Sequence, residues 1–447
     1  MPSSIIDSNY FRDMFGTEAM RSVFSDESRI QAWIDTEIAL AKAQVQTGVI
    51  PNGVDENIAK VAFLYNFDIV AMKEDFDRVG FPILPFVKQL TKLCDAETAK
   101  WVHYGATTQD ILDTGMVLQI RKGLEIIEDE IGSILSALAS LAKKHRATVM
   151  AGRTFQQLAA PITFGYKAAI WLDEMLRHRE RLYQIKERIL VGQCAGAVGT
   201  FATLGNKALA VQTVMMEHLK LDTPKITWHT SRDRWSELIS FHALLGSTLA
   251  KIANEVAVLM RSEIGELSEP FETGRGASTT LPQKRNPISC EPIIANAHRL
   301  REMASSQMIA MIQEHERGVG QMHIEWMVTP DSFILLSGSL HHTKFILENL
   351  WVDTNNMRKN LDIGGGLLMS ESVMMGLAPK VGKSNAHHLV YAAAGRAMDN
   401  GTTLREELVN DNEICKNLTV QEIDALIDPS NYVGSAGEMV DAVLKLV

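Results

Sequence analysis

The 447-residue sequence lacks any apolar run long enough to cross a membrane, and it shows no excess of basic residues. Its formal net charge of −10 argues against a nucleic-acid backbone as the main partner. The N-terminal residues contain no basic stretch followed by an apolar run, so no secretory signal is predicted. We therefore expect a cytoplasmic protein that binds neither membranes nor nucleic acids.

The sequence also has few cysteines, and the four present are scattered without the spacing of metal ligands. We expect free thiols in a reducing compartment. The histidine pairs at 341–342 and 387–388 lack carboxylates at a suitable spacing, and His315 and His323 lie eight residues apart. Neither a metal site nor a cofactor is predicted.

Prolines are scarce, at 13, which leaves long stretches free to be helical. In residues 243–268, apolar side chains recur at steps of four and three from Leu245 to Leu259, which is the period of one helix face. Residues 111–144 and 165–190 behave similarly. The pattern predicts an all-α protein with a central bundle of long helices. Breaks near 110 and 360 divide it into an N-terminal helical domain (1–110), a central bundle (111–360) and a C-terminal helical domain (361–447).

Four polar segments interrupt this helical background. The first, HYGATTQD at 103–110, either caps the following helix or holds a carboxylate with its hydroxyls and helix-terminal amides. In the second, GRTFQQLAAP at 152–161, Pro161 fits a helix start, the two glutamines are caps or ligand contacts, and Arg153 is an anion partner or a solvated side chain.

The third segment is TWHTSRDRWSEL, residues 227–238. We expect His229 and Arg232 just before or within the first turn of the next helix. A surface ion pair between Arg232 and a neighbouring aspartate is the alternative interpretation. Arg232 and Arg234, two residues apart, do not share a helix face, so we expect at most one to point into a given pocket.

The fourth segment, FETGRGASTTLPQKRNP at 271–287, combines glycines, hydroxyls, Lys284 and Asn286. Glycine permits backbone conformations in which neighbouring N–H groups turn towards an anion. Removing a proton beside a carboxylate creates a dianionic, enolate-like species, which needs fixed positive charge and hydrogen-bond donors. A hydroxyl can serve as the base only if amides and an ammonium stabilise its alkoxide. The composition of this segment fits that task.

Taken together, the segments resemble the fumarase/aspartase superfamily of lyases and cycloisomerases. TTLPQKRNP resembles its Gly-Ser-Ser-x-Met-Pro-x-Lys-x-Asn signature, and HYGATTQDILDT, GRTFQQ, AGAVGTFATLG, WHTSRDR and DPSNYVGSAG follow the order of its members. The resemblance covers nearly the whole chain. It implies a three-domain, all-α protomer in a homotetramer, with each active site assembled from three subunits.

Within the superfamily, the chain most resembles 3-carboxy-cis,cis-muconate cycloisomerases, and next adenylosuccinate lyases. Phe67 and Phe155 stand where adenylosuccinate lyases carry histidines. A phenyl ring cannot transfer a proton, and cycloisomerases also have an aromatic residue at the second position. Intramolecular ring closure releases no separate leaving group that would need protonation.

The signature also places Thr279 where members have the catalytic second serine, while Ser278 matches the first. Thr279 is the base, Ser278 has replaced it, or the chemistry is altered; the narrower rotamer range of threonine leaves all three open. The resemblance implies that Lys284 and Asn286 stabilise the dianion. It implies substrate contacts from all four segments: His103, Thr107, Thr108, Arg153, Gln157, His229, Arg232, Arg285 and Asn286.

We therefore expect an enzyme that transfers a proton at the carbon beside a carboxylate of a small di- or tricarboxylic acid, as the cycloisomerases do. The first alternative is β-elimination that releases fumarate from a substituted succinate. The second is a non-catalytic structural or binding member of the superfamily.

Overall fold

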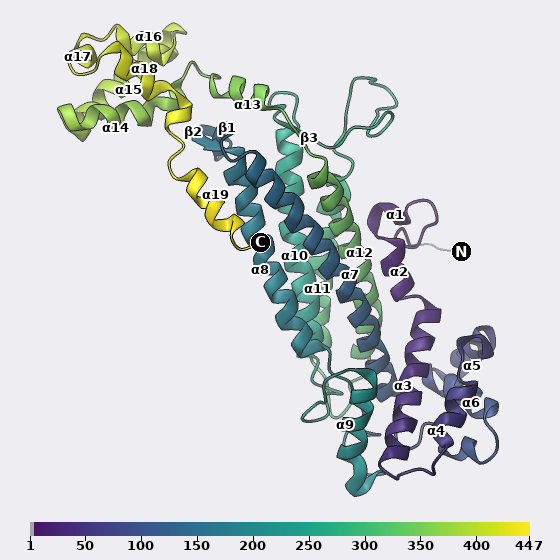
Figure 1. Cartoon of the computed structure of the whole chain (residues 1–447). Coiled ribbons are helices and arrows are strands. Elements are labelled where there is room, and N and C mark those ends of the chain that lie inside the picture. Colours follow the sequence, from purple (N-terminus) through teal and green to yellow (C-terminus); the bar gives the residue numbers. More distant parts are fainter. Residues whose placement is uncertain (1–3) are drawn as a thin grey trace. The chain divides into compact units, whose positions relative to one another are not determined.

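The computed structural model describes residues 4–447, which fold almost entirely into helices (Figure 1). The all-α prediction is confirmed. The helices are α1 (Arg12–Phe15), α2 (Glu18–Val23), α3 (Asp26–Gln46), α4 (Val54–Val61), α5 (Ile69–Val79), α6 (Ile83–Leu93), α7 (Thr108–Lys144), α8 (Phe164–Ile189), α9 (Ala208–Leu219), α10 (Asp233–Leu259), α11 (Cys290–Ala310), α12 (Gln321–Glu348), α13 (Thr354–Leu361), α14 (Ser370–Val381), α15 (Lys383–Asn400), α16 (Leu404–Val409), α17 (Asn412–Cys415), α18 (Val420–Ile427) and α19 (Ala436–Leu444).

Five short 3-10 helices and two small antiparallel sheets complete the secondary structure elements of the described residues. One pairs β1 (Val149–Thr154) with β2 (Gln157–Thr163), and the other pairs β3 (Leu267–Ser268) with β4 (Trp351–Val352). None of the helices described is long and apolar enough to span a bilayer.

The chain divides into two compact units. The first contains residues 1–130, 178–249 and 292–341, and the second contains 131–177, 250–291 and 342–447. The long helices α7, α8, α10, α11 and α12 each begin in one unit and end in the other. The predicted domain boundaries near 110 and 360 stay predictions.

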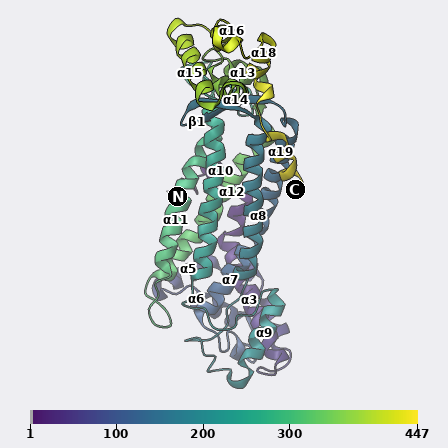
Figure 2. The same cartoon turned by 90° about the vertical axis from the view of Figure 1, so that its left-hand side faces the viewer.

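The apolar helix face predicted within residues 243–268 is the buried face of α10. Leu245, Leu249, Ile252, Val256 and Leu259 are all at most 1% exposed. The apolar face predicted for 165–190 is likewise buried in α8. The long helices run side by side in both views (Figure 2). Burial of these faces, at about 25 cal/mol per Å² of apolar surface, is the main contribution to holding them together.

One predicted helix boundary is wrong. The helix expected over 243–268 ends at Leu259, and 267–268 form β3 instead. Gly265 adopts a φ of +59°, and the N–H of Glu266 turns back to donate to the carbonyl of Leu259. The left-handed glycine closes the turn that follows the helix, a conformation that other residues adopt only at a cost.

The first unit has its own core around the N-terminal helices. Phe67 stacks on Phe86 of α6, with ring centroids 5.2 Å apart, and Trp33 on α3 meets Phe86 edge to face at 5.7 Å. The helix α9 packs against α3 (Figure 2). Phe67 is therefore a core residue in this chain.

The second unit contains the C-terminal helices, which bury a separate apolar cluster. Val373 and Leu377 of α14 pack with Ala393 of α15, Leu408 of α16 and Ile423 of α18. Two of these helices, α16 and α18, begin with capping boxes, in which a threonine hydroxyl and a glutamate satisfy each other's backbone N–H groups. This unit therefore holds a locally stabilised helical module beyond the long helices.

Candidate active site

The first polar segment forms the turn before α7. His103 lies there at φ +57°, and its Nδ1 is 2.5 Å from a carboxylate oxygen of Glu37. Burial lowers the pKa of His103, but the carboxylates of Glu37 and Asp110 raise it by more, so this pKa lies above its ordinary value. Thr107 precedes the helix and Thr108 begins it, and both are half-buried.

Asp110, which is fully buried on the first turn of α7, organises the surroundings of this turn. Its carboxylate accepts hydrogen bonds from the N–H groups of Thr107, Ala195 and Gly196, at 2.9 to 3.0 Å. His229, 2% exposed, places its Nε2 2.9 Å from the same carboxylate. The first and third polar segments therefore meet, and capping of α7 comes from an aspartate that sequence reasoning did not single out.

Arg232 lies immediately before α10 and is 2% exposed. Its guanidinium donates to both oxygens of Asp113 and both oxygens of Glu325, at 2.5 to 3.1 Å. It also lies 4.6 Å from the ring centroid of Trp235 and 5.0 Å from that of Trp228. The carboxylates that Arg232 holds here are the protein's own.

The acidic partners of Arg232 share one positive charge between them. Burial raises the pKa of Glu325, and Arg232, which lowers it, compensates only in part. Burial also lowers the pKa of Arg232 itself, but the two carboxylates raise it well above its ordinary value. The surface ion pair considered for Arg232 is replaced by a buried network, in which the cost of desolvation is offset by several hydrogen bonds.

The second polar segment is the β1–β2 hairpin, and the helix start expected at Pro161 is wrong. Pro161 lies in β2 opposite Ala151, where an edge strand tolerates its missing N–H. Phe155 and Gln156 form the tip with positive φ, and Phe155 is 98% exposed. Gln157 begins β2 and is also exposed.

Arg153 on β1 is neutralised inside its own unit. Its guanidinium binds both oxygens of the fully buried Glu266, at 2.6 and 3.0 Å. Asn360 on α13 donates to the same carboxylate at 2.8 Å. Arg153 therefore attaches the hairpin to its support, and its charge is already compensated.

The fourth segment forms a long loop between β3 and α11. Gly276, at φ +67°, accepts two hydrogen bonds on its carbonyl from the backbone and side chain of Asn286, at 3.2 and 3.1 Å. A Cβ at Gly276 would lie 2.9 Å from the carbonyl oxygen of Asn286. Ala277 and Arg285 form an isolated bridge across the loop. Glycine is required here by both the conformation and the close approach.

The predicted catalytic side chains lie on this loop. Ser278 is half-buried, and its hydroxyl oxygen accepts from the N–H groups of Thr280 and Leu281, at 3.2 and 3.1 Å. Thr279 and Lys284 are exposed, and among residues 4–447 no partner is recorded for the Lys284 ammonium. Arg285 lies over the ring of Phe271, 3.9 Å from its centroid.

A buried acid fixes the far end of the loop. Glu269, 5% exposed, accepts from the N–H groups of Ser289 and Cys290, at 2.8 to 3.1 Å, where α11 begins. A carboxylate at a helix N-terminus satisfies free amides and the positive end of the helix dipole. Arg275 within the loop donates to the Ser289 hydroxyl.

The predicted residues thus fall into two sets within the chain. One unit brings together His103, Thr107, Thr108, His229 and Arg232. The other carries Arg153, Gln157, Ser278, Thr279, Lys284, Arg285 and Asn286. Their roles towards a substrate stay predictions.

Sequence reasoning missed the buried acids that organise both sets: Glu37, Asp110, Asp113, Glu266, Glu269 and Glu325. Several stand among apolar residues at helical spacing, as in ILDTG and HIEWM. An acid at a position that faces the core needs a partner, so acids at these positions could have indicated buried ion pairs or hydrogen bonds.

Comparison with protein families shows that residues 14–301 match the family model described as "Lyase". Residues 366–443 match the model described as "Adenylosuccinate lyase C-terminus". The chain belongs to this lyase family, the fumarase/aspartase superfamily. The first match alone covers more than half of the chain and includes all four polar segments.

Two relatives match the chain over almost its full length. An N-acetyl-S-(2-succino)cysteine lyase of Dickeya dadantii is 39% identical, covering 100% of this chain and 98% of the relative. A 3-carboxy-cis,cis-muconate cycloisomerase of Pseudomonas aeruginosa is also 39% identical, covering 99% and 97%. The crystal structure of 3-carboxy-cis,cis-muconate lactonizing enzyme from Pseudomonas putida superposes with a TM-score of 0.93 at 38% identity, covering 98% and 99%.

Proposed function

We propose that this lyase-family enzyme transfers a proton at the carbon beside a carboxylate of a small di- or tricarboxylic acid, in a cycloisomerase-like reaction. The loop at 271–287 would carry the reacting groups, and the other polar segments would bind the substrate. The proposal rests chiefly on Lys284, an exposed ammonium on the loop that also presents Ser278 and Thr279.

The availability of Lys284 distinguishes it from Arg153, Arg232 and Arg285. Arg153 and Arg232 are paired with buried carboxylates, and the Arg285 guanidinium lies over Phe271. The Lys284 ammonium has no such internal partner among residues 4–447. An ammonium in this position suits the charge that develops when a proton leaves the carbon beside a carboxylate.

Two hydroxyls are candidates for the base. Ser278 Oγ accepts hydrogen bonds from two backbone N–H groups. These bonds would favour its alkoxide, because hydrogen bonds to the charged form of a hydroxyl lower the pKa of that hydroxyl. Thr279 is exposed and matches the position of the second serine in the family signature. Comparison of Ser278→Ala with Thr279→Val separates them, because loss of the base should abolish turnover and loss of the neighbour should not.

β-Elimination from a substituted succinate is the second candidate, because a 2-succinocysteine lyase and a muconate cycloisomerase are equally similar to the chain. Phe155 bears on the choice. Its exposed ring cannot protonate a leaving group, and intramolecular addition of a carboxylate to a double bond requires no such acid. Incubation with carboxymuconate and with succinyl thioethers or amines, followed by ultraviolet absorbance, distinguishes the reactions; release of fumarate would favour elimination.

Replacing Lys284 by methionine tests the proposal. We expect Lys284→Met to lower kcat by roughly 100- to 1,000-fold, as removal of a group that stabilises a developing oxyanion does. Lys383→Met on α15, another exposed lysine, is the matched control and should retain full activity. Unchanged kcat in Lys284→Met with the substrate identified by the screen would refute the assignment.

We further propose that the chain forms a homotetramer in which the polar segments of different subunits meet. Exposed apolar side chains on the long helices, such as Ile309 on α11 and Met327 on α12, support this, since another subunit would cover them.

A further inference from the structure

A buried carboxylate on α3 faces the first polar segment. Glu37 is 3% exposed and lies among buried apolar residues of that helix. It contacts the ring of His103, 66 residues further along the chain, with 2.5 Å between a carboxylate oxygen and Nδ1. A buried carboxylate without a partner is costly, so this one requires the imidazole as a hydrogen-bond donor.

This contact orients the ring of His103. Because Nδ1–H donates to Glu37, the other ring nitrogen, Nε2, is left for a different partner. Within residues 4–447 no partner is recorded for this nitrogen, and the side chain is 19% exposed. The backbone of His103 has a φ of +57°, a strained conformation that persists only where the surroundings hold it. The ring is therefore fixed with one nitrogen available to a ligand.

The charges around His103 favour its protonated form. Two carboxylates act on the ring, that of Glu37 from α3 and that of Asp110 from α7. Their other titratable neighbours are His229, which binds Asp110, and Cys194, a thiol that burial keeps neutral by raising its pKa. Burial of the ring lowers the pKa of His103, and the carboxylates more than reverse this, Glu37 contributing more than Asp110. Removing the charge of Glu37 should therefore lower the pKa of His103.

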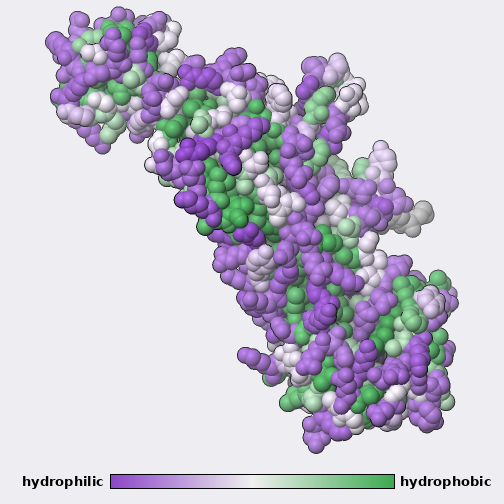
Figure 3. Space-filling view, in the orientation of Figure 1, coloured by the Kyte–Doolittle hydropathy of each residue, from purple (hydrophilic) through white to green (hydrophobic). Residues whose placement is uncertain are grey.

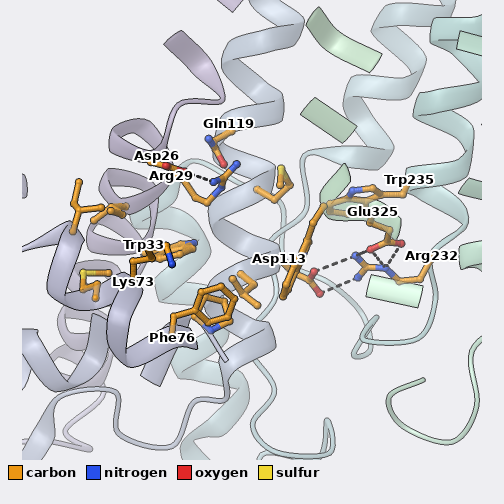
Figure 4. Close-up of a pocket in the computed structure, with 17 residues that line it drawn as sticks. Asp26, Arg29, Trp33, Lys73, Phe76, Asp113, Gln119, Arg232, Trp235 and Glu325 are labelled. Atoms are coloured by element: carbon orange, nitrogen blue, oxygen red, sulfur yellow. Dashed lines mark hydrogen bonds and ion pairs between the residues drawn. The ribbon is translucent and has the colours of Figure 1, made fainter. Parts of the chain in front are cut away.

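The other basic side chains predicted to bind the substrate in this unit are already engaged. The guanidinium of Arg232 lies between Asp113 and Glu325 and donates to both (Figure 4). His229 is 2% exposed, and its Nε2 is held by a buried carboxylate. Charged N–H donors are the strong partners of carboxylates. Of these three basic residues, His103 can present such a donor to a ligand.

We propose that Glu37 is a positioning residue of the proposed active site: its carboxylate fixes the ring of His103 and favours the charged imidazole, whose Nε2–H binds a carboxylate of the substrate. The inference rests on the proposed function for the class of substrate. Glu37 does not touch the substrate and acts through His103. Affinity falls as the pH rises through the pKa of His103, because the neutral ring keeps its proton on Nδ1 for Glu37 and offers none at Nε2.

Titration of His103 by nuclear magnetic resonance tests the electrostatic part and needs no turnover. The full-length chain carries isotope-labelled histidine, and the His103 signal is the one missing from His103→Asn, since asparagine tolerates a positive φ. We expect the pKa of His103 to lie above its ordinary value in the wild type and to fall by about one unit in Glu37→Gln. Asp35→Asn removes an exposed acid from the same helix and should leave this pKa unchanged.

Calorimetry with tricarballylate, a saturated tricarboxylate, tests the binding part. Its affinity for the wild type should fall as the pH rises from neutral to alkaline. At a pH above both pKa values, Glu37→Gln should bind about tenfold more weakly, because one unit in pKa changes the charged fraction about tenfold. His103→Asn should bind weakly at every pH, and Asp35→Asn should bind like the wild type. Thermal melting checks that each variant is folded.

The two measurements separate this inference from the proposed reaction. The inference is overturned if His103 titrates alike in the wild type and Glu37→Gln, if the affinity for tricarballylate does not follow this titration, or if the folded wild type does not bind tricarballylate. Should tricarballylate bind as expected while no candidate substrate is turned over, the proposed reaction fails and the role of Glu37 in binding carboxylates is supported.

Discussion

At the scale of single residues, the positively charged side chains of the polar segments differ in whether a carboxylate pairs with them. Arg153 and Arg232 are held by buried carboxylates, whereas Lys284 has no recorded side-chain partner among residues 4–447. A buried guanidinium paired with two acids is expensive to disturb, because removing it leaves uncompensated charge in a low-dielectric interior. An exposed ammonium can be replaced at little cost to folding.

Replacing Arg232 by methionine should therefore lower the free energy of unfolding by about 3–5 kcal/mol. Urea denaturation at neutral pH, followed by circular dichroism, measures this change. The cause is the pair of carboxylates left in the core.

Glu325→Gln is the matched comparison. It removes one acid but leaves Asp113 paired with Arg232, so we expect a loss of less than about 1.5 kcal/mol. Equal losses in the two variants would contradict the interpretation that the guanidinium compensates both acids.

The residue types of the site could be predicted from the sequence, but their partners could not. Arg232 stands in a segment whose polarity is evident, while Asp113 and Glu325 are 119 and 93 residues away along the chain. Nothing local links them, since tertiary packing alone brings the three together. The same holds for Arg153 and Glu266, 113 residues apart.

At the scale of elements, the long helices were predictable because their apolar residues recur with the helical period. The helices α7 and α8 begin and end within a few residues of the predicted ranges. The β1–β2 hairpin was not predictable in this way. Gly152 and Pro161 are unfavourable in strands. The two strands pair only with each other and are supported by α13, and their sequences show little alternation of apolar and polar residues.

The loop between β3 and α11 depends on Glu269 at its far end. We expect Glu269→Ala to destabilise the chain by about 1–2 kcal/mol, because the first amides of α11 lose their acceptor. Hydrogen exchange of the backbone around Ser289 and Cys290 should rise accordingly, and this can be followed by mass spectrometry.

Glu272→Ala provides the control within the same loop. Glu272 is exposed, and its backbone carbonyl accepts from the N–H of Arg275. Its replacement should leave exchange at the start of α11 unchanged. If both variants exchange alike, the Glu269 carboxylate is not what holds this end of the loop.

At the scale of the whole molecule, hydrophobic residues remain exposed along the long helices. Leu244 on α10, Met308 and Ile309 on α11, and Met327 on α12 are examples. Figure 3 shows patches of green, hydrophobic surface among the purple on the face in view. Such surface is typical of faces that another subunit covers.

We expect light scattering to give a mass four times that of one chain. Ile309→Glu should shift this mass towards smaller species, because a charge on a buried subunit contact is costly. Met398→Glu places the same charge at an exposed methionine of α15 and should leave the mass unchanged. A wild-type monomer would contradict the homotetramer.

The four residues from Glu266 to Glu269 connect two of the polar segments. Glu266 holds Arg153 near the tip of the hairpin, and Glu269 secures the beginning of α11. An engineer who transplants the loop at 271–287 into a related scaffold must therefore carry this tetrapeptide with it. A variant in which the loop is exchanged without these four residues would lose both its attachment to the β1–β2 hairpin and its attachment to the beginning of α11.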